Sequence, residues 1–198
     1  MKLYWCPQSR ATTAVWLMEE AGVAYERVLI DIRTGAQAVD AYRAINPMMK
    51  VPALVDGEAV VAETGAICAY VADRVPEAGL APAIGDPARG RYLQYLVFAS
   101  SCIEPAIAQI FTKMEIPSGS AGWGSAERVF NVLEGELQKG DWILGDRFSA
   151  ADIVIGAGLR FAARQFKLVP ERPAFTAYLD RCEARPALQR ALAISEAN

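Results

Sequence analysis

The chain has 198 residues, of which 53% are hydrophobic and 22% charged, so it can bury a sizeable core as one large or two small domains. Its net charge of −3, with basic residues scattered singly, argues against nucleic acid or an anionic membrane as the main partner. It has no histidine and its four cysteines lie far apart, which argues against a metal site. We expect no metal, no apolar run of the roughly 18 residues that span a bilayer, no leader peptide, and a cytoplasmic location.

The N-terminal part of the sequence predicts a strand, a helix and a second strand. Residues 3–5 form a short strand that is ended by Pro7. Residues 12–21 carry apolar side chains at helical spacing and are followed by Gly22, a common helix stop. Residues 25–30 alternate in polarity and then become apolar, as a strand does. A strand–helix–strand unit predicts that its two strands run parallel.

After a weakly helical segment, residues 46–70 combine three signals. Pro52 precedes a short apolar run and cannot donate to a sheet ladder, so it marks a strand start or a turn, with a cis peptide as one option. Asp56-Gly57 separates this run from a second one, which predicts a hairpin. Thr64 opens an apolar-periodic segment as a plausible N-cap. A helix N-terminus with free N–H groups and a hydroxyl can bind an anion such as a carboxylate.

Residues 75–87 hold three prolines and two glycines without periodicity, which predicts a linker and a domain boundary. Strand signals disappear after it. Apolar residues at helical spacing predict a helix over residues 91–114, kinked or broken at Pro105. Further helices are predicted over residues 126–139, after residue 150, and over residues 173–183 and 186–194.

The segment from Phe148 to Ile153 carries a helix start signal of high specificity. With Ser149 as N-cap, Asp152 falls at the third helical position and completes a capping box. Phe148 and Ile153 take the two positions of a hydrophobic staple. We assign Ser149 and Asp152 a structural role, at the head of a helix that is apolar nearly all round.

The motif N-P-x-x-K-V-P-A-L, followed by a D-G hairpin and A-E-T-x-A-I, resembles the glutathione transferase family in its bacterial cytosolic form. The F-S-A-A-D box supports the same resemblance, which covers nearly the whole chain. It implies an α+β thioredoxin-like domain (βαβ-α-ββα) over residues 1–76, a linker over 77–87, and an all-α helical-bundle domain over 88–198. It also implies a homodimer that acts in detoxification, with glutathione and a small hydrophobic electrophile as substrates.

The resemblance implies a set of glutathione-binding residues. In the family, the backbone of the residue before a cis-proline pairs with the cysteinyl unit, and an acidic-hydroxyl pair at a helix start holds the γ-glutamyl end. A lysine is a weaker candidate for the glycyl carboxylate. These roles fall on Val51, Pro52, Glu63, Thr64 and Lys50. Met49 departs from the family, which often has glycine at this position.

The expected chemistry is attack by the glutathione sulfur on an electrophilic carbon. A thiol with a pKa of about 8.5 is mostly protonated at neutral pH, so the site must offer the sulfur a hydrogen-bond donor or a positive dipole. The turn between the first strand and the first helix is the natural place. Ser9 is the first candidate donor and Arg10 a helper, whereas Tyr4 is weaker because it falls within the strand. Cys6 is the alternative, since Cys-Pro-x-Ser resembles monothiol glutaredoxins and cysteine-type transferases.

Three functions therefore stay open. The first is a glutathione transferase whose hydrophobic substrate pocket would use Phe98, Ile107, Phe111 and Met114. The second is a glutathione-dependent thiol oxidoreductase that uses Cys6. The third is a non-catalytic binding module, which the Met49 departure favours.

Overall fold

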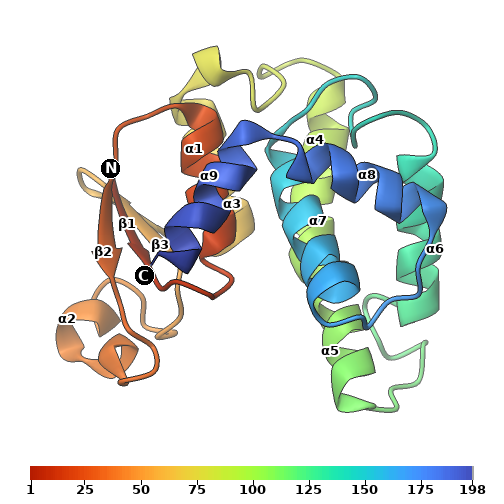
Figure 1. The fold of residues 1–198 in the computed structure, drawn as a ribbon, viewed down its shortest axis with the longest axis horizontal. Helices are drawn as coiled ribbons and strands as arrows, with labels where there is room; N and C mark the ends of the chain where they lie inside the picture. The colour runs from red at the N-terminus through yellow and green to blue at the C-terminus, as the bar shows by residue number, and fades with distance from the viewer. Residues whose placement is uncertain (198) are drawn as a thin grey trace. The chain divides into compact units, whose positions relative to one another are not determined.

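The computed structural model describes residues 1–197 and divides into two compact units (Figure 1). One unit is Met1–Ala78 together with Arg185–Asn198, and the other is Gly79–Ala184. The sequence-based division assigned residues 88–198 to a single helical domain. The structure differs at the C-terminal end, because helix α9 (Pro186–Glu196) packs on helix α1 (Thr12–Ala21) of the first unit.

The first unit is built on a four-stranded sheet in the order β2-β1-β3-β4. The strands are β1 (Lys2–Trp5), β2 (Glu26–Leu29), β3 (Ala53–Asp56) and β4 (Ala59–Ala62). β1 and β2 are parallel, while β3 is antiparallel to both β1 and β4. Gly57 turns the β3–β4 hairpin with a φ of 60°, a conformation that glycine adopts without strain. The parallel pair and the hairpin confirm the predictions.

Helices cover one face of this sheet and a small cluster covers the other. α1 and α3 (Thr64–Arg74) lie against one face (Figure 1). Because side chains alternate along a strand, Tyr4 points to the opposite face from its buried neighbours Leu3 and Trp5. Its ring lies 5.8 Å from that of Tyr42, centroid to centroid, on the short helix α2 (Asp40–Arg43), which follows the 3-10 turn Ala36–Ala38. Tyr4 therefore serves the core, and its predicted place within the strand is confirmed.

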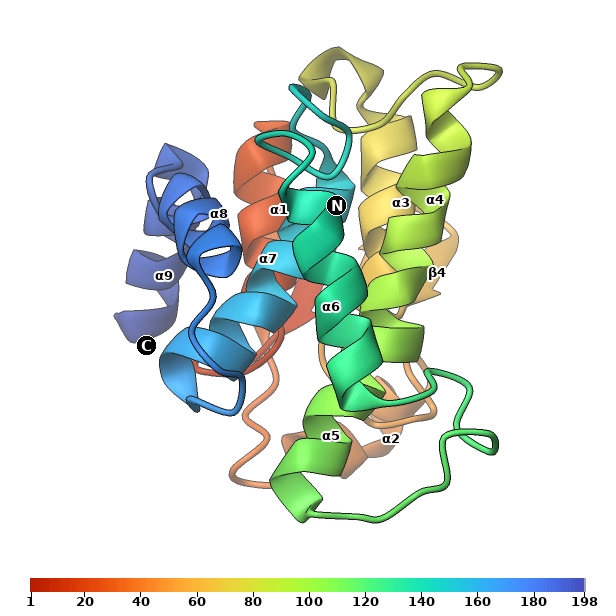
Figure 2. The same cartoon turned by 90° about the vertical axis from the view of Figure 1, so that its right-hand side faces the viewer.

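The second unit is helical apart from two isolated β-bridges. Its helices are α4 (Ala88–Phe98), α5 (Glu104–Thr112), α6 (Ala126–Leu137), α7 (Ala150–Arg160) and α8 (Pro173–Glu183). α7 packs on α4 and lies beside it in Figure 1, whereas in the view of Figure 2 α6 is drawn between the two. π-helical segments follow α4 (Ala99–Ile103) and α7 (Phe161–Gln165). The predicted break at Pro105 takes the form of the first of these segments, after which α5 starts with the proline in its first turn.

The predicted capping box is present at the start of α7. Asp152 Oδ2 accepts hydrogen bonds from the backbone N–H of Ser149 at 2.9 Å and from its hydroxyl at 3.1 Å. Asp152 Oδ1 accepts from the N–H of Ile143 at 2.8 Å and from the hydroxyl of Tyr178 at 3.1 Å. Both Ser149 and Asp152 are fully buried, so this network joins the α7 start to α8 and to the preceding loop.

The predicted fold class, a thioredoxin-like first part and a helical second part, is confirmed. The expectation that the chain has no apolar run of the roughly 18 residues that span a bilayer was wrong. The helical stretch Ala88–Thr112 contains a window long and apolar enough to cross a membrane, although core helices of soluble proteins pass the same test.

Candidate functional site

The register of the sheet gathers three segments that the sequence singled out. Tyr4 of β1 is paired with Ala53 of β3, and Ala53 is paired with Ala62 of β4. The chain therefore leaves β1, enters β3 and leaves β4 at the same edge of the sheet. The turn after β1, the loop before β3 and the start of α3 all meet at this edge, and they carry the predicted catalytic and glutathione-binding residues.

The turn after β1 is organised by the Ser9 side chain. Its hydroxyl donates to the carbonyl of Cys6 at 2.7 Å and accepts from the backbone N–H of Ala11 at 3.1 Å. Ser9 and Arg10 are both half-buried. In this arrangement the hydroxyl proton of Ser9 is bound to the chain itself, so donation to a ligand requires the hydroxyl to rotate away from Cys6. The N-terminus of α1 directly follows the turn and adds a positive dipole.

Cys6 occupies a different environment from Ser9. Only 1% of its surface is exposed, at the point where β1 enters the turn. A thiol that attacks a mixed disulfide must be reached by the second sulfur. The burial of Cys6 is therefore a barrier to its use as a nucleophile in this conformation.

Two buried side chains fix the loop before β3. The peptide bond between Val51 and Pro52 is cis. The preceding carbonyl, that of Lys50, accepts hydrogen bonds from the Tyr42 hydroxyl and from Asn46 Nδ2, the latter at 2.8 Å. Burial raises the pKa of Tyr42 to about 12, so its hydroxyl is protonated and can donate at neutral pH. Together these bonds set the position of the backbone on which Val51 is carried.

The Met49 departure has a visible backbone counterpart. Met49 has a φ of 55°, in the left-handed region that glycine enters freely and other residues enter at a cost of about 1 kcal/mol or more. The loop thus adopts the conformation that a glycine favours, with a methionine in its place. Its N–H donates to the carbonyl of Asn46 at 2.9 Å, which closes the turn.

The start of α3 combines an irregular backbone with an uncapped helix end. Thr64 is the first helical residue, and Glu63 takes the N-cap position, so the predicted N-cap at Thr64 was one residue late. Glu63 has φ 66° and ψ 120°, a sparsely populated conformation of the kind that clusters at functional sites. Within residues 1–197, no side chain caps this helix. Its first N–H groups are therefore open to an anion.

The four predicted pocket residues are not equivalent in the structure. Ile107 is 4% exposed and belongs to the core of the second unit, which argues against a role in an open pocket. Phe98 is half-buried, with its ring 5.5 Å from that of Tyr95. Phe111 and Met114 are 65% and 54% exposed and are available to an apolar ligand.

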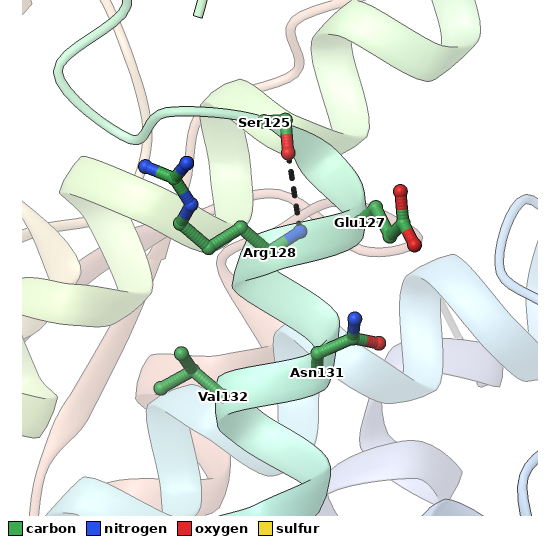
Figure 3. Close-up of a pocket in the computed structure, with 5 residues that line it drawn as sticks. All are labelled: Ser125, Glu127, Arg128, Asn131 and Val132. Atoms are coloured by element: carbon green, nitrogen blue, oxygen red, sulfur yellow. Dashed lines mark hydrogen bonds between the residues drawn. The ribbon is translucent and has the colours of Figure 1, made fainter.

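A surface pocket lies along α6, lined by Ser125, Glu127, Arg128, Asn131 and Val132 (Figure 3). The Ser125 hydroxyl accepts from the backbone N–H of Arg128 at 3.2 Å and caps the helix. Asn131 accepts from Arg172 at 2.8 Å. Two of the polar groups that line this pocket, Ser125 and Asn131, thus serve the fold. None of the predicted site residues lines the pocket, and we assign it no function.

The sequence did not single out three residues that shape the candidate site. Tyr42 and Asn46 hold the Lys50 carbonyl, and Ser195 of α9 contacts the turn after β1. Asn46 could have been found as the polar member of the N-P turn. Ser195 gives a weaker signal, a single hydroxyl at the end of an apolar helix stripe.

Two family models and several known proteins match this chain in sequence. The sequence model described as "Glutathione S-transferase, N-terminal domain" matches residues 1–73, and the one described as "Glutathione S-transferase, C-terminal domain" matches residues 123–186. Glutathione S-transferase F10 of Arabidopsis thaliana is 30% identical over 88% of this chain and 87% of its own length. The disulfide-bond oxidoreductase YfcG of Escherichia coli K12 is 27% identical over 96% of this chain and 93% of its own.

Among solved structures, a sphingomonad glutathione S-transferase in complex with glutathione superposes with a TM-score of 0.81, at 32% identity and with all of both chains covered. Fold, sequence motifs and relatives agree along the length of the sequence. The chain belongs to the glutathione S-transferase family.

Proposed function

We propose that the chain is a glutathione transferase, which binds glutathione at the sheet edge described above and activates its thiol for attack on a hydrophobic electrophile. The observation that carries the proposal is the register that joins Tyr4, Ala53 and Ala62, because it brings the turn after β1, the loop before β3 and the start of α3 together. The glutathione bound in the sphingomonad relative supports glutathione as the substrate.

In the proposed complex each part of glutathione has a chemical partner. The backbone of Val51, held by the Lys50 carbonyl contacts, pairs with the cysteinyl unit. Glu63 takes the γ-glutamyl ammonium, and Thr64 with the N–H groups of α3 takes the γ-glutamyl carboxylate. Lys50 takes the glycyl carboxylate. Support for the last role comes from its exposure and from the lack of an ion-pair partner for its ammonium among the described residues.

Thiol activation is proposed to depend on the turn after β1. Ser9 rotates its hydroxyl from the Cys6 carbonyl toward the sulfur, while Ala11 still donates to its oxygen. Arg10 and the N-terminus of α1 add positive potential. A pKa lower by about two units makes thiolate the main form at neutral pH, which corresponds to roughly 2.7 kcal/mol. The thiol proton passes to solvent, the sulfur lone pair forms the carbon–sulfur bond, and the leaving group departs with its electron pair.

A thiol oxidoreductase that uses Cys6 is the second candidate, favoured by the likeness to the E. coli oxidoreductase. The burial of Cys6 speaks against it. Two matched variants separate the candidates in assays of conjugation and of mixed-disulfide reduction. As a transferase, the protein loses conjugation on Ser9→Ala and keeps it on Cys6→Ser. The opposite pattern, with loss of disulfide reduction on Cys6→Ser, would establish the oxidoreductase.

We also propose that the protein is a cytoplasmic homodimer and that exposed apolar side chains receive the electrophile. Leu93 and Val97 of α4 are 43% and 61% exposed one helical turn apart, an apolar stripe suited to a homodimer interface, which sedimentation analysis tests. All four cysteines are free, which fits a reducing cytoplasm. Exposed Phe111 and Met114, with Phe98, are proposed to receive the hydrophobic electrophile in detoxification.

A further inference from the structure

Helix α9 reaches back to the N-terminal turn through one buried hydroxyl. Ser195 is 5% exposed, and its Oγ accepts a hydrogen bond from the backbone N–H of Gln8 at 2.8 Å. The same Oγ lies 3.1 Å from Oγ1 of Thr12, close enough for a second hydrogen bond. Gln8 and Thr12 lie on either side of Ser9 and Arg10, so Ser195 holds the turn on both sides of the proposed thiol-activating residues.

The sequence of α9 explains why a serine is buried there. The buried residues Leu188, Ala191 and Ser195 follow the 3–4 spacing of one helix face, and this face packs on α1. Ser195, the last residue of this face, lies at the N-terminal end of α1, next to the N–H of Gln8 and the hydroxyl of Thr12. A hydroxyl satisfies both polar groups, which an apolar side chain would leave unpaired.

Ion pairs fix α9 along the same contact. Arg185 binds Glu20 in a bidentate pair with N–O distances of 2.6 and 2.7 Å, and the Glu20 side chain is only 8% exposed. Arg190 binds Glu19 at 2.7 Å. The helix is thus held at two points on α1 before it reaches the turn, so the place of Ser195 is set by more than its own hydrogen bonds.

The turn needs an external support. Gln8 has a φ of 54°, the left-handed region, and is not glycine. A non-glycine residue keeps this backbone conformation only where neighbouring contacts stabilise it. At Gln8 the hydrogen bond from its N–H to Ser195 is such a contact. Loss of this bond releases the backbone between Cys6 and Ser9, and with it the direction of the Ser9 hydroxyl.

We propose that Ser195 is a positioning residue for thiol activation: from the C-terminal helix, it holds the turn in the geometry that lets Ser9 and Arg10 stabilise the glutathione thiolate. The proposal rests on the transferase function proposed above. Ser195 acts through the turn and does not touch the sulfur. Its effect is thus expected on ionisation of the thiol and on kcat more than on the affinity for glutathione.

Ser195→Ala tests this, with the pKa of the bound glutathione thiol measured by ultraviolet titration and with steady-state kinetics. We expect a higher thiol pKa and a kcat about fivefold lower near neutral pH, with the KM for glutathione changed less than about twofold. Arg190→Ala is the control, because it removes one ion pair of α9 while the bidentate Arg185–Glu20 pair still holds the helix and the hydrogen bonds of Ser195 to the turn remain in place. It should lower stability but leave the thiol pKa unchanged.

Hydrogen exchange at the Gln8 amide reports directly on the contact and should speed up in Ser195→Ala. If Ser195→Ala does not fold, Thr12→Val removes the other hydroxyl of the network, and a smaller shift of the thiol pKa in the same direction is expected. A bound glutathione thiol with the same pKa in Ser195→Ala as in the wild type would overturn the positioning role alone. A wild-type protein that binds glutathione without ionising it would overturn this role and the transferase proposal together.

Discussion

The start of α7 and the turn before α1 are both organised by serine hydroxyls, but their partners lie at different distances along the chain. At α7, Ser149 and Asp152 are three residues apart, and one capping motif contains them both. At α1, the turn that holds Ser9 is braced by Ser195, which lies 187 residues from the Gln8 amide. The first arrangement can be recognised from a few consecutive letters of sequence. The second exists only once α9 has packed on α1.

The α7 network and the turn before α1 also differ in what they affect, the first the stability of the fold and the second the proposed function. The α7 network is fully buried and links only parts of the fold, whereas the turn before α1 is half-buried and contains groups that a ligand can reach. We therefore expect changes at α7 to act on the free energy of unfolding. Changes around the turn and the neighbouring loop should act on glutathione.

Asp152→Ala breaks the local arrangement. It leaves the buried N–H groups of Ile143 and Ser149 without their acceptor, while the Tyr178 hydroxyl keeps only the backbone carbonyl of residue 152 at 3.2 Å, so we expect about 3 kcal/mol less stability. Denaturant unfolding measures it. Asp146→Ala is the matched control, since Asp146 is exposed in the same loop and should change stability by less than about 0.5 kcal/mol. Equal effects of the two substitutions would refute the structural role.

The pH dependence of stability gives a second test of the structural role of Asp152. Burial raises the pKa of Asp152 to about 6, although four hydrogen-bond donors oppose the shift, while in the unfolded chain the pKa is about 3.9. Between these values the folded state binds a proton that the unfolded state does not. This contribution to stability is complete below about pH 4 and is lost as the pH rises through about 6.

On going from pH 7 to pH 5, Asp152 should therefore add about 1.4 kcal/mol to the stability of the wild type. Asp152→Asn cannot titrate and serves as the reference for all other groups. Unfolding midpoints of both proteins at the two pH values give the difference. The same pH dependence in both would mean that the carboxyl titrates normally.

The loop before β3 is an intermediate case, because its contacts are local but its role is in binding. Asn46→Ala removes the bond to the Lys50 carbonyl and also the one from the Met48 N–H to Asn46 Oδ1, at 3.1 Å. We expect the dissociation constant of glutathione to rise about fivefold, as the backbone at Val51 is no longer fixed. Arg43→Ala, at an exposed ion pair on α2, should leave it unchanged when measured by calorimetry.

Met49→Gly is expected to have the smallest effect. Glycine relieves the left-handed backbone at φ 55° but gains freedom in the unfolded chain, so stability should rise by only about 0.5 kcal/mol. Glutathione binding should persist. Met48→Gly, whose residue has no such φ, should lower stability instead. A strong gain of glutathione affinity in Met49→Gly would instead support the view that this departure weakens the natural site.

The sequence was sufficient where signals are local. Gly22, the Asp56-Gly57 turn and the Ser149–Asp152 box each fix an element boundary through nearby backbone chemistry, and each is present as predicted. The sequence failed where packing decides. The apolar spacing around Ile107 could not distinguish core from pocket, and the division into domains could not foresee that α9 packs on α1. The candidate site was located through motifs, but its supports from Tyr42 and Ser195 required the structure.

The proposed thiol activation is tested most directly by a calorimetric titration of the purified protein with glutathione, followed by an ultraviolet spectrum of the complex at about pH 7. A glutathione transferase predicts saturable binding and a thiolate band that is absent from free glutathione at this pH. It also predicts that Ser9→Ala weakens that band while glutathione still binds. No binding at millimolar glutathione, or binding with a fully protonated thiol, would contradict it.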